Sequence, residues 1–146
     1  MKEGRNLKKI FLLLSFCLML SMPVCMAENF CFVDAVGTSG YYVDTDSVSF
    51  ETAELTEWVD GKPMNITNEM LNACIAVKKP SANKMYIYAV QFNYTKETYQ
   101  IFSSQVIQYD TKKILEDKEL AQAPLPYGPS SPMHSIVSYV RNLYGK

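Results

Sequence analysis

Side chains that enzymes use for catalysis are scarce in this sequence. His134 is the only histidine among the 146 residues, and neither a glycine-rich phosphate loop nor a Cys/His zinc spacing occurs. With a single histidine, the sequence offers almost no residues for Ser–His or Cys–His nucleophilic catalysis. We predict no catalytic, cofactor-binding or metal-binding residue, no cofactor, and a protein that is not an enzyme.

The few clusters of acidic residues are better explained by local structure than by metal binding or catalysis. Asp44 and Asp46 begin like a calcium loop, but Val48 stands at the next ligand position and no glycine follows. A turn is therefore the better interpretation of this segment. Glu116 and Glu119 are typical of a solvated face, and we expect His134 at the surface of a helix.

An excess of charge of either sign is also missing. Lysine and arginine total 14 and aspartate and glutamate total 15, for a formal net charge of −1, and the two signs are interspersed. A nucleic-acid-binding protein would be expected to show a basic face, and the sequence order displays none. Nucleic acid is therefore not an expected partner.

Long hydrophobic runs are confined to the N-terminus. Four of the first nine residues are basic (Lys2, Arg5, Lys8 and Lys9). An apolar run follows from Ile10 to about Leu20, and short residues such as Cys25 and Ala27 end the segment. These are the three parts of a secretory signal peptide. We predict that residues 1–27 are a signal peptide, cleaved between Ala27 and Glu28, and that the protein works in the periplasm, at the cell surface or outside the cell.

Two other interpretations of this N-terminus are weaker. An uncleaved anchor would need roughly 20 apolar residues, and the strong run here is shorter and is followed by Pro23. A lipid anchor on Cys17 or Cys25 would want a small preceding residue, where the chain has Phe16 and Val24. No second apolar stretch approaches spanning length, so we expect no membrane span after cleavage.

The cysteines suggest one disulfide in a single exported domain. Cys17 and Cys25 would leave with the signal peptide, and Cys31 and Cys74 remain in the mature chain, residues 28–146. In an oxidising compartment such a pair is expected to form a disulfide. In the chain-entropy model, closing a loop of this length stabilises the folded state by about 4 kcal/mol. The alternative is two free thiols. The mature chain is long enough for one domain with a core.

The middle of the chain reads as strands separated by turns. Asp44 to Ser47 is predicted to stop one strand, and Asp60-Gly61 to form a hairpin turn. The segment 64–72 is left open between a loop and a helical turn. Short links between the other runs imply an antiparallel meander. The strand-like runs are 30–36, 41–43, 54–59, 74–78, 85–94, 99–109 and 113–117.

Alternation assigns the faces of two strands. In the run 85–94 the even-numbered side chains, from Tyr86 to Tyr94, share one face and the odd-numbered ones share the other. In the next run we place Tyr99, Ile101, Ser103, Gln105, Ile107 and Tyr109 on one face. Neither face is cleanly polar, so part of the sheet is expected to be covered on both sides.

A helix is predicted over residues 131–144. Ser131 can cap its N-terminus, Pro132 suits the first helical position, and Gly145 can end it. The apolar positions recur at helical spacing, at Met133, Ile136, Val137, Val140, Leu143 and Tyr144. The predicted fold class is α+β, an antiparallel β-sheet meander with one C-terminal α-helix packed on it.

Tyrosine is unusually frequent, with ten copies. Exposed tyrosine offers a large contact area with a polar tip, so Tyr41 and Tyr42 are candidates for protein binding. The alternative is that these tyrosines only pack in strands, where the residue is favoured.

The run Tyr41–Val48, YYVDTDSV, resembles the surface-adhesin protein E family of bacterial exported domains. The likeness continues through Tyr99–Ile101, Val106–Asp110 and Pro129-Ser130 before the helix. The resemblance implies an antiparallel sheet with a C-terminal helix, a bacterial envelope location and attachment to host proteins. The family pattern includes a cysteine near the end of the helix that ties it to the sheet. This helix has none, which directs Cys74 to Cys31.

The sequence thus predicts a non-enzymatic exported domain of the bacterial cell envelope, a protein-binding, adhesin-like module. The alternative is a periplasmic structural or accessory protein that binds another envelope component. In both cases a protein partner is expected, and the sequence does not identify it.

Overall fold

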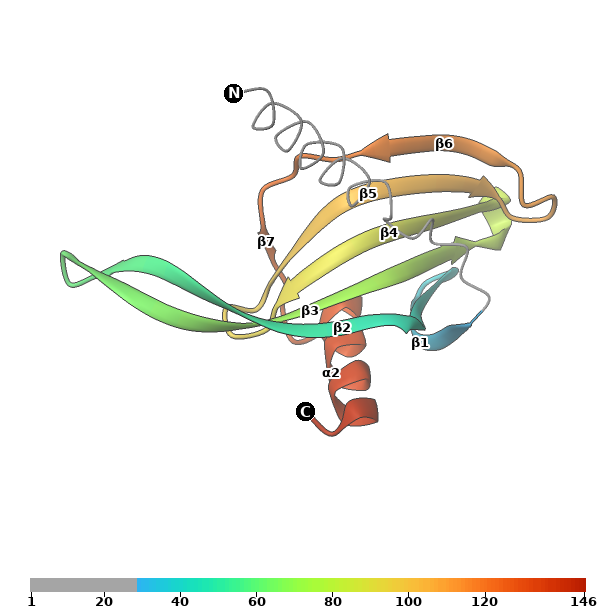
Figure 1. Cartoon of the computed structure of the whole chain (residues 1–146). Helices are drawn as coiled ribbons and strands as arrows, with labels where there is room; N and C mark the ends of the chain where they lie inside the picture. The colour runs from blue at the N-terminus through green and yellow to red at the C-terminus, as the bar shows by residue number, and fades with distance from the viewer. Residues whose placement is uncertain (1–28) are drawn as a thin grey trace, which may run out of the picture.

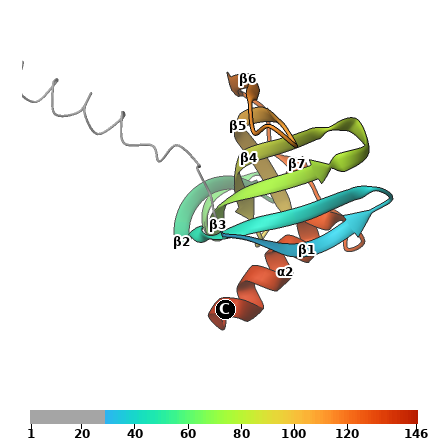
Figure 2. The ribbon, with the colours of Figure 1, turned by 90° about the vertical axis from the view of Figure 1, so that its right-hand side faces the viewer.

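A computed structural model describes residues 29–146, and the predicted α+β fold is confirmed (Figure 1). Each strand from β1 to β5 pairs antiparallel with the next, and β7 pairs with β5 beside this path. The helix α2 lies against one face of the sheet (Figure 2). The elements are β1 (Phe30–Val36), β2 (Ser39–Val59), β3 (Lys62–Lys79), a 3-10 turn (Pro80–Ala82), β4 (Lys84–Asn93), β5 (Thr98–Gln108), β6 (Ile114–Glu119), β7 (Leu125–Pro126) and α2 (Pro132–Tyr144).

The strand break predicted at Asp44–Ser47 is a bulge inside one long strand. The register moves from Asp44 opposite Cys74 to Ser49 opposite Asn72, so β2 has extra residues there. The Asp46 N–H donates to the Asp44 carboxylate, and the Cys74 N–H donates to Ser47 Oγ at 2.7 Å. The short polar side chains therefore bond the local backbone as predicted, while the partner strand remains attached. The segment 64–72, left open above, belongs to β3.

A second bulge corrects the predicted face of β5. Ile101 is opposite Val90 while Ser103 is opposite Ala89, so Phe102 is the extra residue between them. The side chains on either side of a bulge change face. Tyr99 and Ile101 consequently pack on the side of α2, while Ile107 and Tyr109 pack on the opposite side. The alternation predicted for β4 holds.

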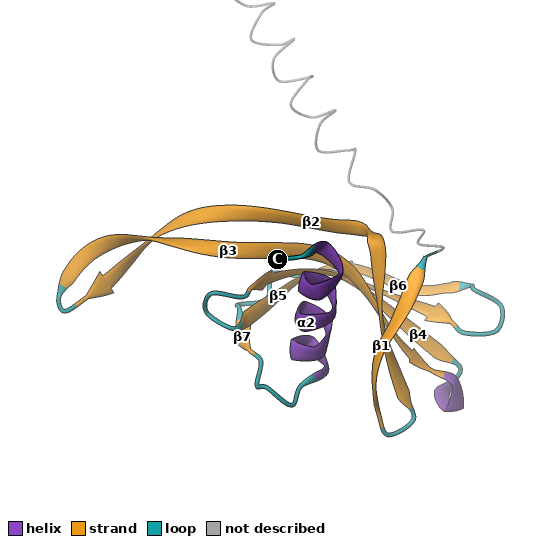
Figure 3. Ribbon diagram, turned by 90° about the horizontal axis from the view of Figure 1, so that it is seen from below, coloured by secondary structure: helices purple, strands orange, loops and turns teal. Residues whose placement is uncertain are grey.

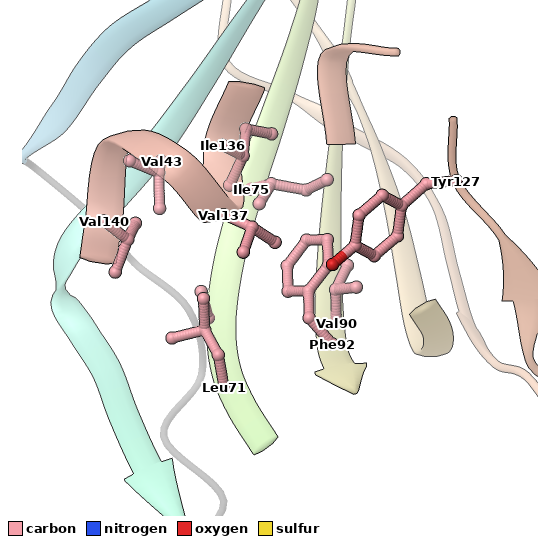
Figure 4. Packing of buried hydrophobic residues seen from close by; sticks show 10 residues of the cluster. Val43, Leu71, Ile75, Val90, Phe92, Tyr127, Ile136, Val137 and Val140 are labelled. Carbon is pink, nitrogen blue, oxygen red and sulfur yellow. The ribbon is translucent and has the colours of Figure 1, made fainter. Parts of the chain in front are cut away.

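The main core lies between the sheet and α2 (Figure 4). Ile136, Val137 and Val140 of the helix are buried, as the apolar stripe predicts, but Leu143 is exposed. We call this side of the sheet the helix face and the other side the outer face. The buried residues of the helix face are Val43, Leu71, Ala73, Ile75, Val90, Phe92 and Tyr127, and a smaller group on the outer face is Ala76, Met85, Ile87 and Ile107.

Polar contacts at both ends fix the position of α2. Ser131 Oγ accepts from the His134 N–H at 3.2 Å, and Gly145 ends the helix with φ 66°, as its capping signals predict. The Ser135 hydroxyl donates to Asp34 on β1 at 2.7 Å, and this bond lowers the pKa of Asp34. The Tyr144 hydroxyl donates to the Thr45 carbonyl at 2.8 Å. These contacts attach the helix to β1 and β2.

The predicted Cys31–Cys74 disulfide is not formed. Cys31 is opposite Val43 and faces α2, where a hydrogen bond with its thiol raises the pKa of Tyr139. Val43 in turn is opposite Ile75, so the adjacent Cys74 points to the outer face. Cys31 is a free thiol and therefore does not bridge to Cys74. Two cysteines on opposite faces of one sheet cannot bridge.

The predicted signal peptide and its cleavage point between Ala27 and Glu28 lie outside the described residues, as do Cys17 and Cys25. Within residues 29–146, α2 is neither long nor apolar enough to cross a bilayer.

Candidate functional site

The most unusual feature of the structure is a two-stranded hairpin that projects beyond the sheet (Figure 3). Strand β3 pairs with β4 only from Met70 onward, while its pairing with β2 continues out to Lys62. Residues 52–69 therefore have strand partners only among themselves. Glu69 still bonds to Tyr94 and Thr95, and beyond it both edges of the hairpin are free. We call residues 52–69 the arm. An isolated two-stranded hairpin is at best marginally stable, so the arm depends on how its root is held.

The tip of the arm is the predicted two-residue turn. Val59 is opposite Lys62, and Asp60 and Gly61 between them have φ 51° and 75°. Positive φ at both central positions suits the right-handed twist of a hairpin, and Asp-Gly tolerates it best. The turn sequence thus explains why the chain reverses at this point.

Apolar side chains on the arm are exposed. Trp58, the only tryptophan of the chain, is 75% exposed beside the turn, and Met64 is 51% exposed. Leu55 and Val59 are also exposed. Leu55, Val59 and Met64 share one face of the arm, and Trp58 lies on the other. Single exposed apolar residues are ordinary, but several of them on an element outside the core, a tryptophan included, are typical of an interaction site.

Buried asparagines hold the root of the arm. Asn93 Nδ2 donates to Asn68 Oδ1 at 2.9 Å, and Asn68 Nδ2 donates to the Ile66 carbonyl at 3.0 Å. Both asparagines are buried. The turn after β4 adds an ion pair from Lys96 to Glu57. The arm therefore leaves the sheet in a fixed direction.

Replacing Asn68 with alanine is expected to lower the free energy of unfolding by about 1–3 kcal/mol, because Asn93 would be left buried without its acceptor. Urea unfolding would measure the change. Thr56→Ala is the control, since it removes an exposed hydrogen bond of the arm, to Asn65, and should cost no more than about 0.5 kcal/mol. Equal losses in both variants would contradict this role of Asn68.

The opposite end of β2 and β3 is basic. Five lysines gather on the segments that meet there: Lys78, Lys79, Lys84, Lys112 and Lys113. The Lys78 ammonium lies 3.9 Å from the centre of the Tyr42 ring, and Lys112 lies 4.5 Å from that of Tyr109. Burial and then repulsion from Lys112 lower the pKa of Lys78. We call this region the basic end.

No carboxylate pairs with these five lysines among residues 29–146, where the ion pairs are Lys96–Glu57 and Lys118–Glu116. Sequence order concealed the cluster, because two separate segments contribute to it and acidic residues lie between them.

Tyr41 and Tyr42 do not form one patch, because neighbours on a strand point to opposite faces. Tyr41 packs against the core of the helix face. Tyr42 lies on the outer face, where its ring contacts Phe32 edge-on at 5.5 Å between centroids. Gly40 makes room for this ring, since a Cβ there would lie 2.9 Å from Tyr42 Cε2. Of the predicted pair, Tyr42 alone joins the basic end.

The other titratable residues considered above do not converge. His134 lies on the first turn of α2 with its ring near Tyr127, and Glu116 is on the exposed strand β6. Within the described part of the chain, no three His, Cys, Asp or Glu side chains are placed to hold a metal ion. Neither a protein-family model, nor a curated protein, nor a solved structure matches this chain.

Proposed function

We propose that this protein is a non-enzymatic exported domain of the bacterial cell envelope that binds a protein partner through the arm. The observation that carries the proposal is Trp58, held 75% exposed at the end of an element that adds nothing to the core. The N-terminal leader supports export, and the resemblance to the surface-adhesin protein E family supports an envelope location.

The physical argument is one of energy and preorganisation. Large rigid side chains such as tryptophan supply most of the binding energy in many protein interfaces, since they bury a large apolar area at a small entropic cost. The hydrogen bonds at the root already fix the direction of the arm, so a partner need not order it. A projecting hairpin is therefore suited to contact a protein surface.

Photo-crosslinking tests this proposal. A photoreactive phenylalanine analogue at position 58, in the full chain expressed in the cell, is expected to give adducts of defined mass in the envelope fraction. The control places the analogue at Phe102, which is 44% exposed on β5, outside the arm. Adducts from position 102 alone, or from neither position, would refute the arm as the binding element.

The same cells test export. We expect a mature N-terminus at Glu28 and recovery from the envelope or the medium. A protein with an intact N-terminus in the cytosol would exclude the envelope role. Protease added to intact cells separates the two envelope roles, since it degrades a surface module and spares a periplasmic accessory protein.

A further inference from the structure

We propose that the partner of the arm is a second copy of this chain, and that the arm of one molecule docks on the basic end of the next. This inference rests on the proposed function, since it identifies the partner of the same surface. Self-association would then run head to tail.

Charge complementarity is the first argument. The arm has four carboxylates, from Glu54, Glu57, Asp60 and Glu69, and one lysine, Lys62. Glu57 already pairs with Lys96 of its own chain, which leaves three carboxylates without an ion-pair partner in the described residues. The basic end has five lysines and one nearby carboxylate, Asp110. Opposite potentials on two surfaces steer their encounter and fix their orientation. The net charge of the chain is only −1, yet its negative charge is concentrated on the arm and its positive charge on the basic end.

Distance prevents the two regions from meeting within one molecule. They lie at opposite ends of the β2–β3 ladder, from the turn at Asp60-Gly61 to the pair of Gly40 and Lys78. With a rise of about 3.3 Å per residue, these ends are separated by tens of ångströms. Figure 1 shows the arm pointing away from the body of the sheet. Only another molecule can bring the two regions together.

Apolar and aromatic groups also match. The basic end exposes Phe32 next to Tyr42, and the arm exposes Trp58 on one face and Met64 and Leu55 on the other. Tryptophan is the best aromatic partner for a cation, and the lysines of the basic end already lie over tyrosine rings. Docking would pair these lysines with carboxylates and with the indole while apolar surface is buried on both sides.

Two arrangements would pair the arm with the basic end. In a reciprocal two-fold dimer each arm lies on the basic end of the other molecule, both contacts form at once, and growth stops at two molecules. The proposed head-to-tail contact is instead heterologous. A heterologous contact leaves one free arm and one free basic end on every complex, so chains can grow.

Sedimentation velocity of the exported protein, purified from the cells, tests this geometry. The wild type should grow beyond the dimer with rising concentration in about 20 mM salt and should dissociate in about 500 mM salt, because charge pairing is screened. The arm variant is Glu54→Lys with Trp58→Ala, and the basic-end variant is Lys78→Glu with Lys112→Glu. Each should be monomeric alone, with affinity reduced at least about tenfold.

Mixing the two variants gives the most specific result. The arm variant retains an intact basic end and the basic-end variant retains an intact arm. An equimolar mixture should therefore form dimers and nothing larger. Lys118→Glu, on β6 away from both regions, is the matched control and should behave as the wild type. If circular dichroism shows that the basic-end variant is unfolded, a second variant, Lys78→Gln with Lys112→Gln, is used in its place.

Three results would overturn the inference: a wild type that is monomeric at all concentrations, a dimer that survives in both variants, or a mixture without dimers. Binding of anionic lipid vesicles by a monomeric wild type would assign the basic end to a polyanion instead. If adducts from position 58 contain a different protein while the purified protein is monomeric, the proposed function stands and self-association fails.

Discussion

Replacing Phe92 with alanine is expected to lower the free energy of unfolding by about 3–5 kcal/mol. Phe92 is 0% exposed on β4 and contacts Tyr127 at 6.2 Å and Tyr99 at 6.4 Å between ring centroids. Its removal would leave a cavity between the sheet and the loop that leads to α2 (Figure 4). Denaturant unfolding followed by tryptophan fluorescence and circular dichroism would measure the loss.

Phe102→Ala is the matched control for this change. Phe102 lies on the neighbouring strand β5, is 44% exposed, and is the extra residue of a bulge. We expect its replacement to change the stability by no more than about 0.5 kcal/mol. If the two variants lost equal stability, the core would not lie where the structure places it.

Placing a charge on the buried side of α2 is expected to have a still larger effect. Ile136 is 0% exposed against the sheet, and aspartate there would have to be buried without a partner or would force the helix away. The expected loss is more than about 4 kcal/mol, which approaches the whole stability of many domains. Loss of the cooperative thermal transition would be the readout.

Leu143→Asp provides the comparison within the same helix. Leu143 is 53% exposed in the last turn, so only an unfavourable interaction with the helix dipole is added, worth about 0.3–1 kcal/mol. A variant at position 143 as unstable as the one at position 136 would show that the C-terminal turn packs more tightly than in this structure.

Local signals in the sequence predicted most of the fold. The capping residues and apolar spacing of α2, the Asp60-Gly61 turn and the alternation in β4 all act between neighbours in the chain, so they can be read directly. The bulges in β2 and β5 could not be predicted in this way. A bulge depends on whether the partner strand remains attached, and residues Asp44 to Ser47 are equally compatible with a turn.

The arm and the basic end were missed for a similar reason. The alternation in residues 54–59 is the same whether a third strand covers the segment or not, so the exposure of Trp58 is a tertiary property. The lone tryptophan next to a hairpin turn was the available signal. The cysteine prediction failed because spacing along the chain carries no information about which face of the sheet each side chain takes.

The free edges of the arm make its length adjustable without disturbing the core. Inserting one residue in each strand between the root and Trp58 would turn Trp58 to the opposite side, because successive side chains alternate. Inserting two in each strand would restore its orientation about 6–7 Å further out. The length of the arm and the side on which Trp58 lies can therefore change without a change in folding stability. Related chains could then place their partners at different distances while keeping the same sheet and helix.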